Sequence, residues 1–254
     1  MALYIEVQER TIVMKHEKTI STGFRSLDRV LGGGFHCGSL HVIAARPGMG
    51  KTVFSLQCAA GLAKVTDKKI YIFSLEMSRD YVKEKFTELC TRDSVILDDT
   101  VPVTPSQIRE KLAGISDPGA VIIDYFQLLQ LGGGTCGQNT AISADKIARE
   151  LKQIAKKFDI PVICTSGLSR ALEKRRDCHP VLRDLDKGSG GLVQDTDVIL
   201  FLYRHAYYDI EYYDTEEIED PDGAEVIVAK NCFGECEDLP FRFEGEIPQF
   251  TEEI

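Results

Sequence analysis

Residues 45–52 read Ala45-Arg46-Pro47-Gly48-Met49-Gly50-Lys51-Thr52, and this loop sets the interpretation of the whole chain. It follows an apolar run over 39–45 and precedes an apolar, helix-favouring stretch over 51–64. The loop matches the pattern G-x-x-x-x-G-K-[ST] except at its first position, where Ala45 replaces glycine. A loop of this kind between a strand and a helix directs backbone N–H groups and the positive end of the helix dipole toward a phosphate group. Residues 45–52 therefore predict a nucleotide-phosphate site.

Apolar runs recur along the rest of the chain, and most are continuous rather than alternating. Continuous runs are typical of strands buried on both faces of a mainly parallel sheet. One run, over 239–245, alternates and indicates an edge or hairpin strand. The expected buried strands lie at 39–45, 69–75, 120–129, 160–166, 197–204 and 224–231.

Helical patterns fill the intervals between these strands. Thr104 and Pro105 suit the N-cap and first position of one helix. A helix over 143–158, with Ser143 as its N-cap, has an apolar stripe at Ile147, Leu151, Ile154 and Phe158. We therefore expect an α/β fold, doubly wound, with a largely parallel sheet, helices on both faces and a C-terminal β-hairpin region. Residues 19–254 would form this single domain, and residues 1–18 an N-terminal arm or linker.

The composition excludes several classes of protein. The 254 residues are 43% hydrophobic and 28% charged, and no run of 18 apolar residues indicates a membrane span. The net charge of −10 excludes a protein that is basic over its whole surface, but not a local basic groove. Eight acids fall in the stretch 206–222, which is typical of a solvated loop, with a partner contact as the alternative.

Cysteine usage favours a reducing compartment. Without a secretory signal, the eight cysteines are expected to be reduced thiols of a cytoplasmic protein. Cys232 and Cys236 have the spacing C-x₃-C, but no second pair with zinc spacing accompanies them.

Two carboxylates follow expected strands. Asp124 ends the apolar run over 120–123, where it would support a Mg²⁺ ion ligated by Thr52. Glu76 follows another run and would orient and deprotonate the water that attacks a γ-phosphate, with a helix-capping surface residue as the alternative. Lys51 would reach the β- and γ-phosphates. Because ligands of open parallel sheets bind beyond the carboxyl ends of the strands, these groups and the polar residues 165–166 are expected on one rim.

Residues 20–245 resemble the motor domain of DnaB-type replicative helicases, a branch of the RecA-like ATPases. The resemblance rests on the loop 45–52 and on the segments IFSLEM (72–77), IIDYFQLL (122–129) and AKNCFG (229–234). It implies a RecA-like P-loop NTPase that binds ATP and Mg²⁺. Such proteins assemble as homo-oligomeric hexameric rings, move along single-stranded DNA and act with other replication proteins, with no membrane partner. Family members carry an N-terminal helical domain, and this chain is expected to start near the linker that follows it.

The resemblance assigns roles to particular residues. Glu76 and Lys51 would be catalytic, and Thr52 and Asp124 would hold the metal. The residues that it assigns to nucleotide binding are Ala45, Arg46, Pro47, Gly48, Met49, Gly50, Lys51, Thr52, Asp124 and Lys230.

Several positions depart from the family pattern. Gly167 stands where the family has a glutamine that senses the γ-phosphate, and Cys232 where it has an arginine finger for the neighbouring subunit's nucleotide. Lys85 stands where an arginine is expected nine positions after Glu76, and the stretch 184–197 is one residue longer. An arginine finger is worth about 10³–10⁵ in rate. Reduced activity is therefore expected, with retained Lys230 as a point charge in place of the guanidinium fork.

A basic segment follows the strand expected at 160–166. Residues 170–187 carry six bases against four acids. Charge alone fits a solvated surface run, but in RecA-like ATPases the loop at this position faces the central channel. No aromatic residue interleaves the cluster, so stacking on bases is not expected. The candidate DNA-binding residues are Arg170, Lys174, Arg175, Arg176, Arg183 and Lys187.

Three hypotheses about function follow from these patterns. The first is an ATP-hydrolysing motor of the DnaB type that acts on single-stranded DNA. The second is a catalytically weak ATP-binding regulatory or assembly module without unwinding activity, which Gly167 and Cys232 favour. The third is a KaiC- or RadA-like relative, which the segments 72–77 and 122–129 fit less well.

Overall fold

The computed structural model describes residues 18–92, 94–131, 141–185, 191–208, 220–245 and 248–253. The expectations for residues 1–17, for Lys187 and for most of the acidic stretch 206–222 lie outside these ranges. In the described ranges, no helix has the length and apolar character needed to cross a bilayer. The seven cysteines in them are all free thiols.

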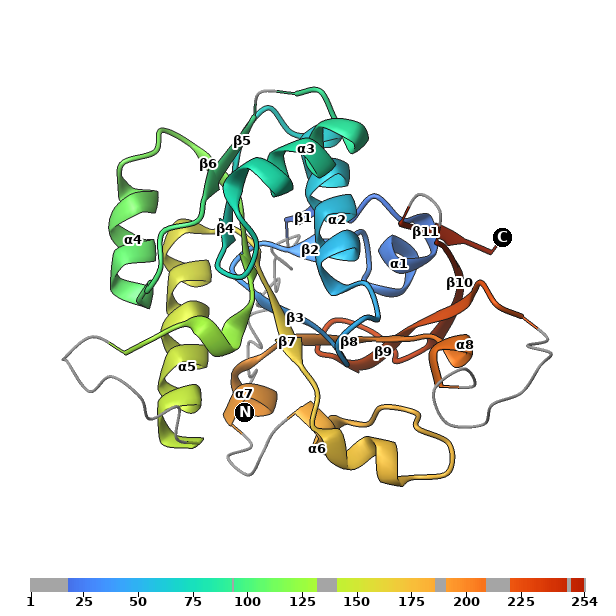
Figure 1. Ribbon diagram of the computed structural model, residues 1–254. Helices are drawn as coiled ribbons and strands as arrows, with labels where there is room; N and C mark the ends of the chain where they lie inside the picture. Colours follow the sequence, from blue (N-terminus) through green and yellow to red (C-terminus); the bar gives the residue numbers. More distant parts are fainter. Residues whose placement is uncertain are drawn as a thin grey trace, which may run out of the picture.

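A nine-stranded sheet forms the centre of the molecule, in the order β11-β10-β9-β8-β3-β7-β6-β4-β5 (Figure 1). In this sheet order, the six strands from β8 to β5 are parallel to one another. The strands β9, β10 and β11 each pair antiparallel with their neighbours. The parallel strands are β3 (Leu40–Ala45), β4 (Lys69–Ser74), β5 (Val95–Asp98), β6 (Pro118–Asp124), β7 (Val162–Gly167) and β8 (Val198–Tyr203). The antiparallel strands are β9 (Gly223–Asn231), β10 (Asp238–Glu244) and β11 (Gln249–Glu252). A separate pair joins β1 (Thr19–Ile20) to β2 (Phe35–His36).

Helices cover both faces of the sheet, as expected from the alternating pattern (Figure 1). The helix α2 (Lys51–Val65) packs with α3 (Arg79–Leu89), whereas α4 (Pro105–Ala113) packs with α5 (Ala141–Phe158), which also contacts α7 (Gly191–Asp195). Right-handed crossovers explain this division, because the chain moves in one direction along the sheet through α2 and α3 and returns through α4 and α5. The shorter elements are α1 (Arg25–Val30), α6 (Leu182–Leu185), α8 (His205–Tyr208) and the 3₁₀ turns η1 (Phe126–Leu128) and η2 (Arg170–Lys174).

Local signals placed most of these elements correctly. Thr104 accepts a hydrogen bond from the backbone N–H of Gln107, whose side chain in turn accepts one from the backbone N–H of Thr104, a capping box that starts α4. In α5, the predicted stripe points inward, and Ile147, Leu151 and Ile154 are buried. The six residues of β3 and the six of β8 are all buried, which explains their continuous apolar runs.

Two boundaries differ from the expectation. The strand expected over 120–129 ends at Asp124, because the chain turns there into η1. Helix α5 begins at Ala141, so Ser143 lies inside the helix and is not its N-cap. The alternating run over 239–245 is a hairpin strand, as expected, because β10 pairs with β11.

Candidate nucleotide-binding site

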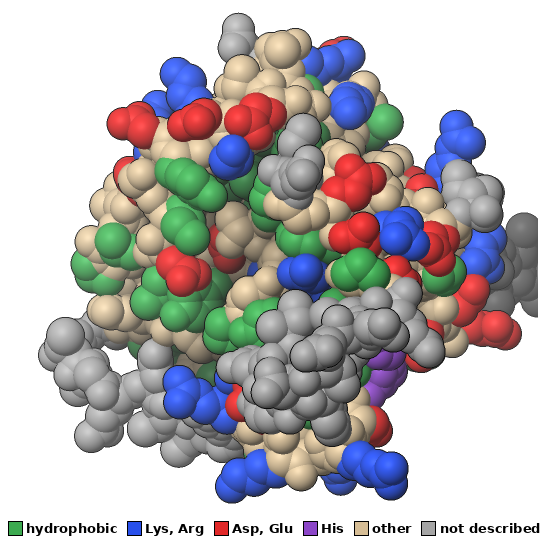
Figure 2. Space-filling view, turned by 45° about the vertical axis from the view of Figure 1, so that its right-hand side comes forward, with side chains coloured by type: hydrophobic (Ala, Val, Ile, Leu, Met, Phe, Trp, Pro, Cys, Tyr) green, Lys and Arg blue, Asp and Glu red, His purple; other side chains and the backbone are tan. Residues whose placement is uncertain are grey.

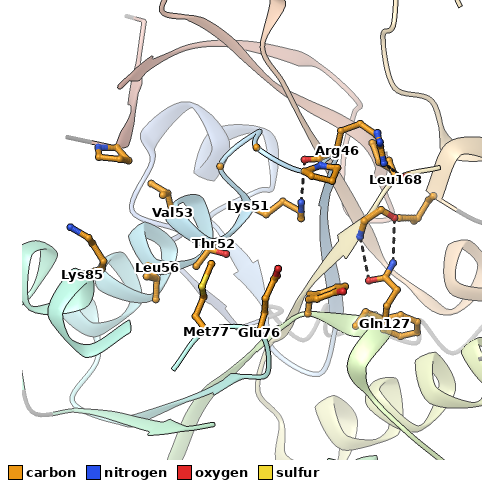
Figure 3. Close-up of a pocket in the computed structure, with 18 of the residues that line it drawn as sticks. Arg46, Lys51, Thr52, Val53, Leu56, Glu76, Met77, Lys85, Gln127 and Leu168 are labelled. Atoms are coloured by element: carbon orange, nitrogen blue, oxygen red, sulfur yellow. Dashed lines mark hydrogen bonds between the residues drawn. The ribbon is translucent and has the colours of Figure 1, made fainter. Parts of the chain in front are cut away.

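A cavity of about 870 Å³ opens beside the loop 46–50, and Figure 3 shows the side chains that line it. Its lining comes from the loop, from α2 and α3, and from residues just beyond the ends of β4, β6 and β7. The carboxyl ends of parallel strands therefore meet here, as the sequence predicts. The predicted residues that line the cavity are Arg46, Pro47, Gly48, Gly50, Lys51, Thr52 and Glu76.

Two glycines give the loop its shape. Gly48 and Gly50 have φ angles of 81° and 92°, in the left-handed region that other residues rarely adopt. A Cβ at Gly50 would lie 2.9 Å from ring atoms of both Phe243 and Phe250. At Gly48 it would lie 2.7 Å from the ring of Tyr207. Both positions consequently require glycine, for the backbone conformation and for the space.

Thr52 and Asp124 form the candidate metal site. The Thr52 hydroxyl donates a hydrogen bond of 2.6 Å to Oδ2 of Asp124, whose other carboxylate oxygen accepts one from Thr165. Asp124 is only 4% exposed. A hydroxyl and a carboxylate at the start of a helix supply the oxygen ligands that Mg²⁺ prefers, so the residues present fit this ion.

Lys51 and Glu76 both line the cavity (Figure 3). The Lys51 ammonium donates to the backbone oxygen of Arg46 at 3.2 Å. Burial lowers the pKa of Lys51, and the nearby carboxylates of Asp124 and Glu76 oppose that shift. A partly buried ammonium group with one carbonyl partner retains donors for an anionic ligand. Among the described residues, none donates a hydrogen bond to the exposed Glu76 carboxylate, which is therefore able to accept one from water.

The sequence profile of the DnaB-like helicase C-terminal domain matches residues 19–92 and 80–252. The chain belongs to this family. The replicative DNA helicase DnaC of Bacillus subtilis is 34% identical over 263 residues, which are 91% of this chain and 56% of that protein. The replicative DNA helicase DnaB of Geobacillus stearothermophilus is 33% identical, with the same shares. The chain thus spans about half the length of these curated relatives.

Solved structures confirm the RecA-like fold of this DnaB-like domain. One of them, an isolated ATPase domain, superposes with a TM-score of 0.82 at 28% identity, covering 93% of this chain and 92% of that one. A DnaB-like replicative helicase, whose structure is described together with its interactions with primase, gives a TM-score of 0.79 at 29% identity. It covers 92% of this chain and 61% of that one.

Four residues predicted to bind nucleotide do not line the cavity of the DnaB-like domain. Asp124 is buried and reaches the site only through its hydrogen bond from Thr52. Ala45 and Met49 are buried behind the loop. Lys230, on β9, donates hydrogen bonds to the backbone oxygens of Val193 (2.7 Å) and Thr196 (2.6 Å). Lys230 therefore holds the end of α7 in this chain instead of reaching the chain's own cavity.

Gln127 is a cavity residue that the sequence did not single out. Its side-chain amide donates to Ser166 Oγ at 2.9 Å and exchanges hydrogen bonds of 3.3 Å with the backbone of Gly167 (Figure 3). Gly167 stands where the family pattern has a glutamine. The side-chain amide of Gln127, which belongs to η1, therefore lies next to the position at which the family has an amide. Only its position within the segment 122–129, shortly after Asp124, could have suggested that Gln127 lines the cavity.

The predicted DNA-binding residues fall into two groups. Arg175 forms two hydrogen bonds of 2.7 Å with Asp184, whose side chain is 4% exposed, and it also contacts the backbone oxygen of His179. Arg175 therefore stabilises the segment from within, an outcome that its charge did not reveal. The exposed members are Arg170, Lys174, Arg176 and Arg183. Figure 2 shows Lys and Arg side chains along the lower edge of the molecule, over η2 and α6.

The start of this segment is tied to the phosphate loop. Arg46 donates to Glu173 at 2.6 Å and to the backbone oxygen of Leu168 at 2.9 Å. On the opposite side of the cavity, Lys85 pairs with Glu88 at 3.2 Å. Arg46 consequently connects the phosphate loop to the basic segment, because its guanidinium group forms hydrogen bonds with residues of that segment and of the chain just before it.

Proposed function

We propose that this chain is an ATP-hydrolysing motor domain of the DnaB type that acts on single-stranded DNA as part of a ring. The observation that carries the proposal is that Thr52, which is hydrogen-bonded to the buried Asp124, lines one cavity together with Lys51 and Glu76. These four groups supply a metal ligand, its supporting carboxylate, a phosphate-binding cation and a base. Their convergence from α2, β6 and the end of β4 is what phosphoryl transfer to water requires.

ATP would bind with its phosphates against the loop 46–50 and the first turn of α2. The backbone N–H groups at this helix start favour anionic oxygens, and Lys51 adds a full positive charge. Thr52 would hold Mg²⁺ directly, with Asp124 accepting a hydrogen bond from its water shell. When bound, the ion neutralises negative charge on the phosphate oxygens.

Glu76 would position the attacking water. Its carboxylate accepts the water proton as the oxygen attacks the γ-phosphorus, the bond to the β-phosphate oxygen breaks, and ADP and phosphate leave. Because Glu76 follows β4 without a described hydrogen-bond donor, the carboxylate can turn toward that water. In the family, an arginine from a neighbouring copy stabilises the developing charge, and Cys232 stands at that position in this chain.

Single-stranded DNA would contact the exposed Lys and Arg side chains of η2 and α6. Arg170, Lys174 and Arg183 carry charges on the surface that begins where β7 ends. Such contacts neutralise phosphates and give a salt-dependent affinity without sequence readout. The link from Arg46 to Glu173 places this surface one residue pair from the phosphate loop. We also propose a hexameric ring in the cytoplasm, with other replication proteins as partners.

The first experiment is steady-state ATP hydrolysis with Mg²⁺, with and without single-stranded DNA. We expect turnover that rises with DNA and falls by at least about a hundredfold in Glu76→Gln, the range that general-base catalysis contributes. Glu88→Gln, an exposed carboxylate on the same cavity, serves as the matched control and should retain turnover. Lys51→Ala should lose ATP binding altogether. Retained ATP binding without turnover in the unmodified chain would contradict the motor and indicate the regulatory module instead.

A further inference from the structure

Outside the nucleotide cavity, four ligand-type side chains gather where the basic segment meets the antiparallel strands. They come from separate parts of the chain: His179 from the segment between η2 and α6, His205 from the start of α8, Glu225 from β9 and Asp238 from β10. One ligand atom each from His179, Glu225 and Asp238 lies within 4.8 Å of the other two. Neither the family resemblance nor the nucleotide site uses any of them.

Glu225 lies at the centre of the group. Its Oε2 is 3.0 Å from Nε2 of His179, and its Oε1 is 2.8 Å from Nε2 of His205. Each carboxylate oxygen of Glu225 thus has one imidazole nitrogen within hydrogen-bond distance.

Asp238 completes the group across the sheet. In the β9–β10 pairing, Asp238 is opposite Ile227 and Pro240 is opposite Glu225, so Asp238 and Glu225 are diagonal neighbours on one face. Asp238 is exposed, and no described residue donates a hydrogen bond to its carboxylate. Two carboxylates this close repel each other unless a cation lies between them.

Tyr203 fixes both rings. The His179 and His205 rings pack edge-on against it, with centroids 5.0 Å and 4.6 Å away, and its hydroxyl donates to the backbone oxygen of Asp177. Each Nε2 is thereby directed at Glu225. This packing restricts the imidazoles before any ligand binds, which reduces the entropy that a bound ligand must overcome.

We propose that His179, Glu225 and Asp238 bind a Zn²⁺ ion, with His205 orienting Glu225 through its second oxygen. One imidazole and two carboxylates suit zinc, whereas Mg²⁺ and Ca²⁺ favour sites made of oxygen alone. A tetrahedral site with bonds of about 2.0–2.1 Å needs ligand atoms closer together than the 4.8 Å limit, so only small side-chain rotations are required. His179 then carries its proton on Nδ1 and offers the Nε2 lone pair, and water takes the fourth position.

The site would join the basic segment to the sheet. His179 is four residues beyond Arg175, and both strands that supply the carboxylates belong to the antiparallel part of the sheet. A bound ion would join residues about 46 and 59 positions apart in the chain, and because this site exists only in the folded chain, its binding free energy adds to the stability of the fold. Zinc should consequently raise the unfolding temperature.

The test is a titration of the full chain with Zn²⁺ alone, without nucleotide. Calorimetry measures the binding, and thermal unfolding with and without Zn²⁺ measures the change in stability. Cys232→Ser and Cys236→Ser are both introduced first, because these exposed thiols would bind zinc themselves. We expect one equivalent of Zn²⁺ to bind and the unfolding temperature to rise. Asp238→Asn should lower the zinc affinity by at least about tenfold. It should not lower the metal-free unfolding temperature, since Asp238 has no described hydrogen-bond partner to lose and its charge repels that of Glu225.

Two further variants make the result decisive. His179→Gln should lower the affinity as Asp238→Asn does. Glu235→Gln, which removes the same charge from an exposed position three residues before Asp238, should not. Absence of zinc binding in the chain that carries Cys232→Ser and Cys236→Ser would overturn the proposal, as would equal affinity in Asp238→Asn and Glu235→Gln.

Discussion

At the scale of single residues, Gly50 couples the phosphate loop to the C-terminal hairpin. The rings of Phe243 and Phe250 lie against it, and they pack edge-on against each other with centroids 4.9 Å apart. Phe250 also packs against Phe54 of α2. A residue selected for a positive φ angle is thus also a packing position for the hairpin.

We therefore expect Gly50→Ala to destabilise the fold as well as the site. The added Cβ meets two rings and the φ angle of 92° is strained, which together should cost about 2–3 kcal/mol. Chemical unfolding monitored by circular dichroism would measure the change. Gly114→Ala is the control, because its φ angle is −82° and its nearest neighbour is 3.5 Å from the added Cβ. A loss in Gly50→Ala no larger than in the control would contradict the packing role.

Gln127 is the second residue whose importance depends on its surroundings. It connects η1 to Gly167, the last residue of the strand from which the basic segment begins. In Gln127→Ala we expect ATP binding to persist while the DNA stimulation of turnover falls on the order of tenfold, a normal size for coupling between sites. Gln130→Ala, exposed and three residues away, is the matched control. Full DNA stimulation in Gln127→Ala would show that the Gln127 amide does not couple DNA binding to ATP turnover.

At the scale of elements, the segment from η2 to α6 is held by the Arg175–Asp184 ion pair. Arg175→Ala leaves the nearly buried Asp184 unpaired, which should cost roughly 3 kcal/mol of stability. Arg183→Ala, at an exposed residue of α6, should change stability by less than about 0.5 kcal/mol. It should instead weaken single-stranded DNA binding and reduce the salt slope by about one. Equal effects of the two variants on stability would contradict this division.

The same ion pair predicts a pH dependence. Burial opposes the shift, but the hydrogen bond from Arg175 holds the pKa of Asp184 below its ordinary value of 3.8. The unfolded chain therefore binds a proton at a higher pH than the folded one, so the stabilisation is complete above pH 3.8 and disappears as the pH falls through the folded value. The difference in stability between the unmodified chain and Arg175→Ala should shrink in the same range.

Elements also show where local patterns are weak. The strand β5 has four partly buried residues at the end of the parallel sheet, and β11 has four residues at the other edge. Neither is long enough to show periodicity, and both form because a neighbouring strand offers free backbone groups. The long strands β3 and β8 and the helices α2 and α5, in contrast, were predicted from their own residues.

At the scale of the whole molecule, Cys232 and Lys230 do not line the chain's own cavity. Cys232 is exposed just beyond the end of β9. If copies of this chain form the ring that we propose, Cys232→Arg should raise ATP turnover by at least about tenfold, since a finger arginine is worth more than that when well placed. The gain should require concentrations at which the chain assembles, and turnover would be measured against protein concentration. Cys236→Arg, also exposed, is the control. An equal gain in both variants would indicate a nonspecific charge effect.

The amino-acid sequence alone determined the phosphate loop, the alternating elements and the carboxylates Glu76 and Asp124, because each depends on residues adjacent in the chain. Periodic burial and helix-start chemistry act over a few residues, and a linear pattern records them. Only the tertiary structure decided that Arg175 pairs with Asp184, that Gln127 lies beside Gly167, and that Lys230 holds α7. The sequence does not record whether a long polar side chain faces solvent or a protein partner. That partner depends on which distant segments pack together in the folded chain.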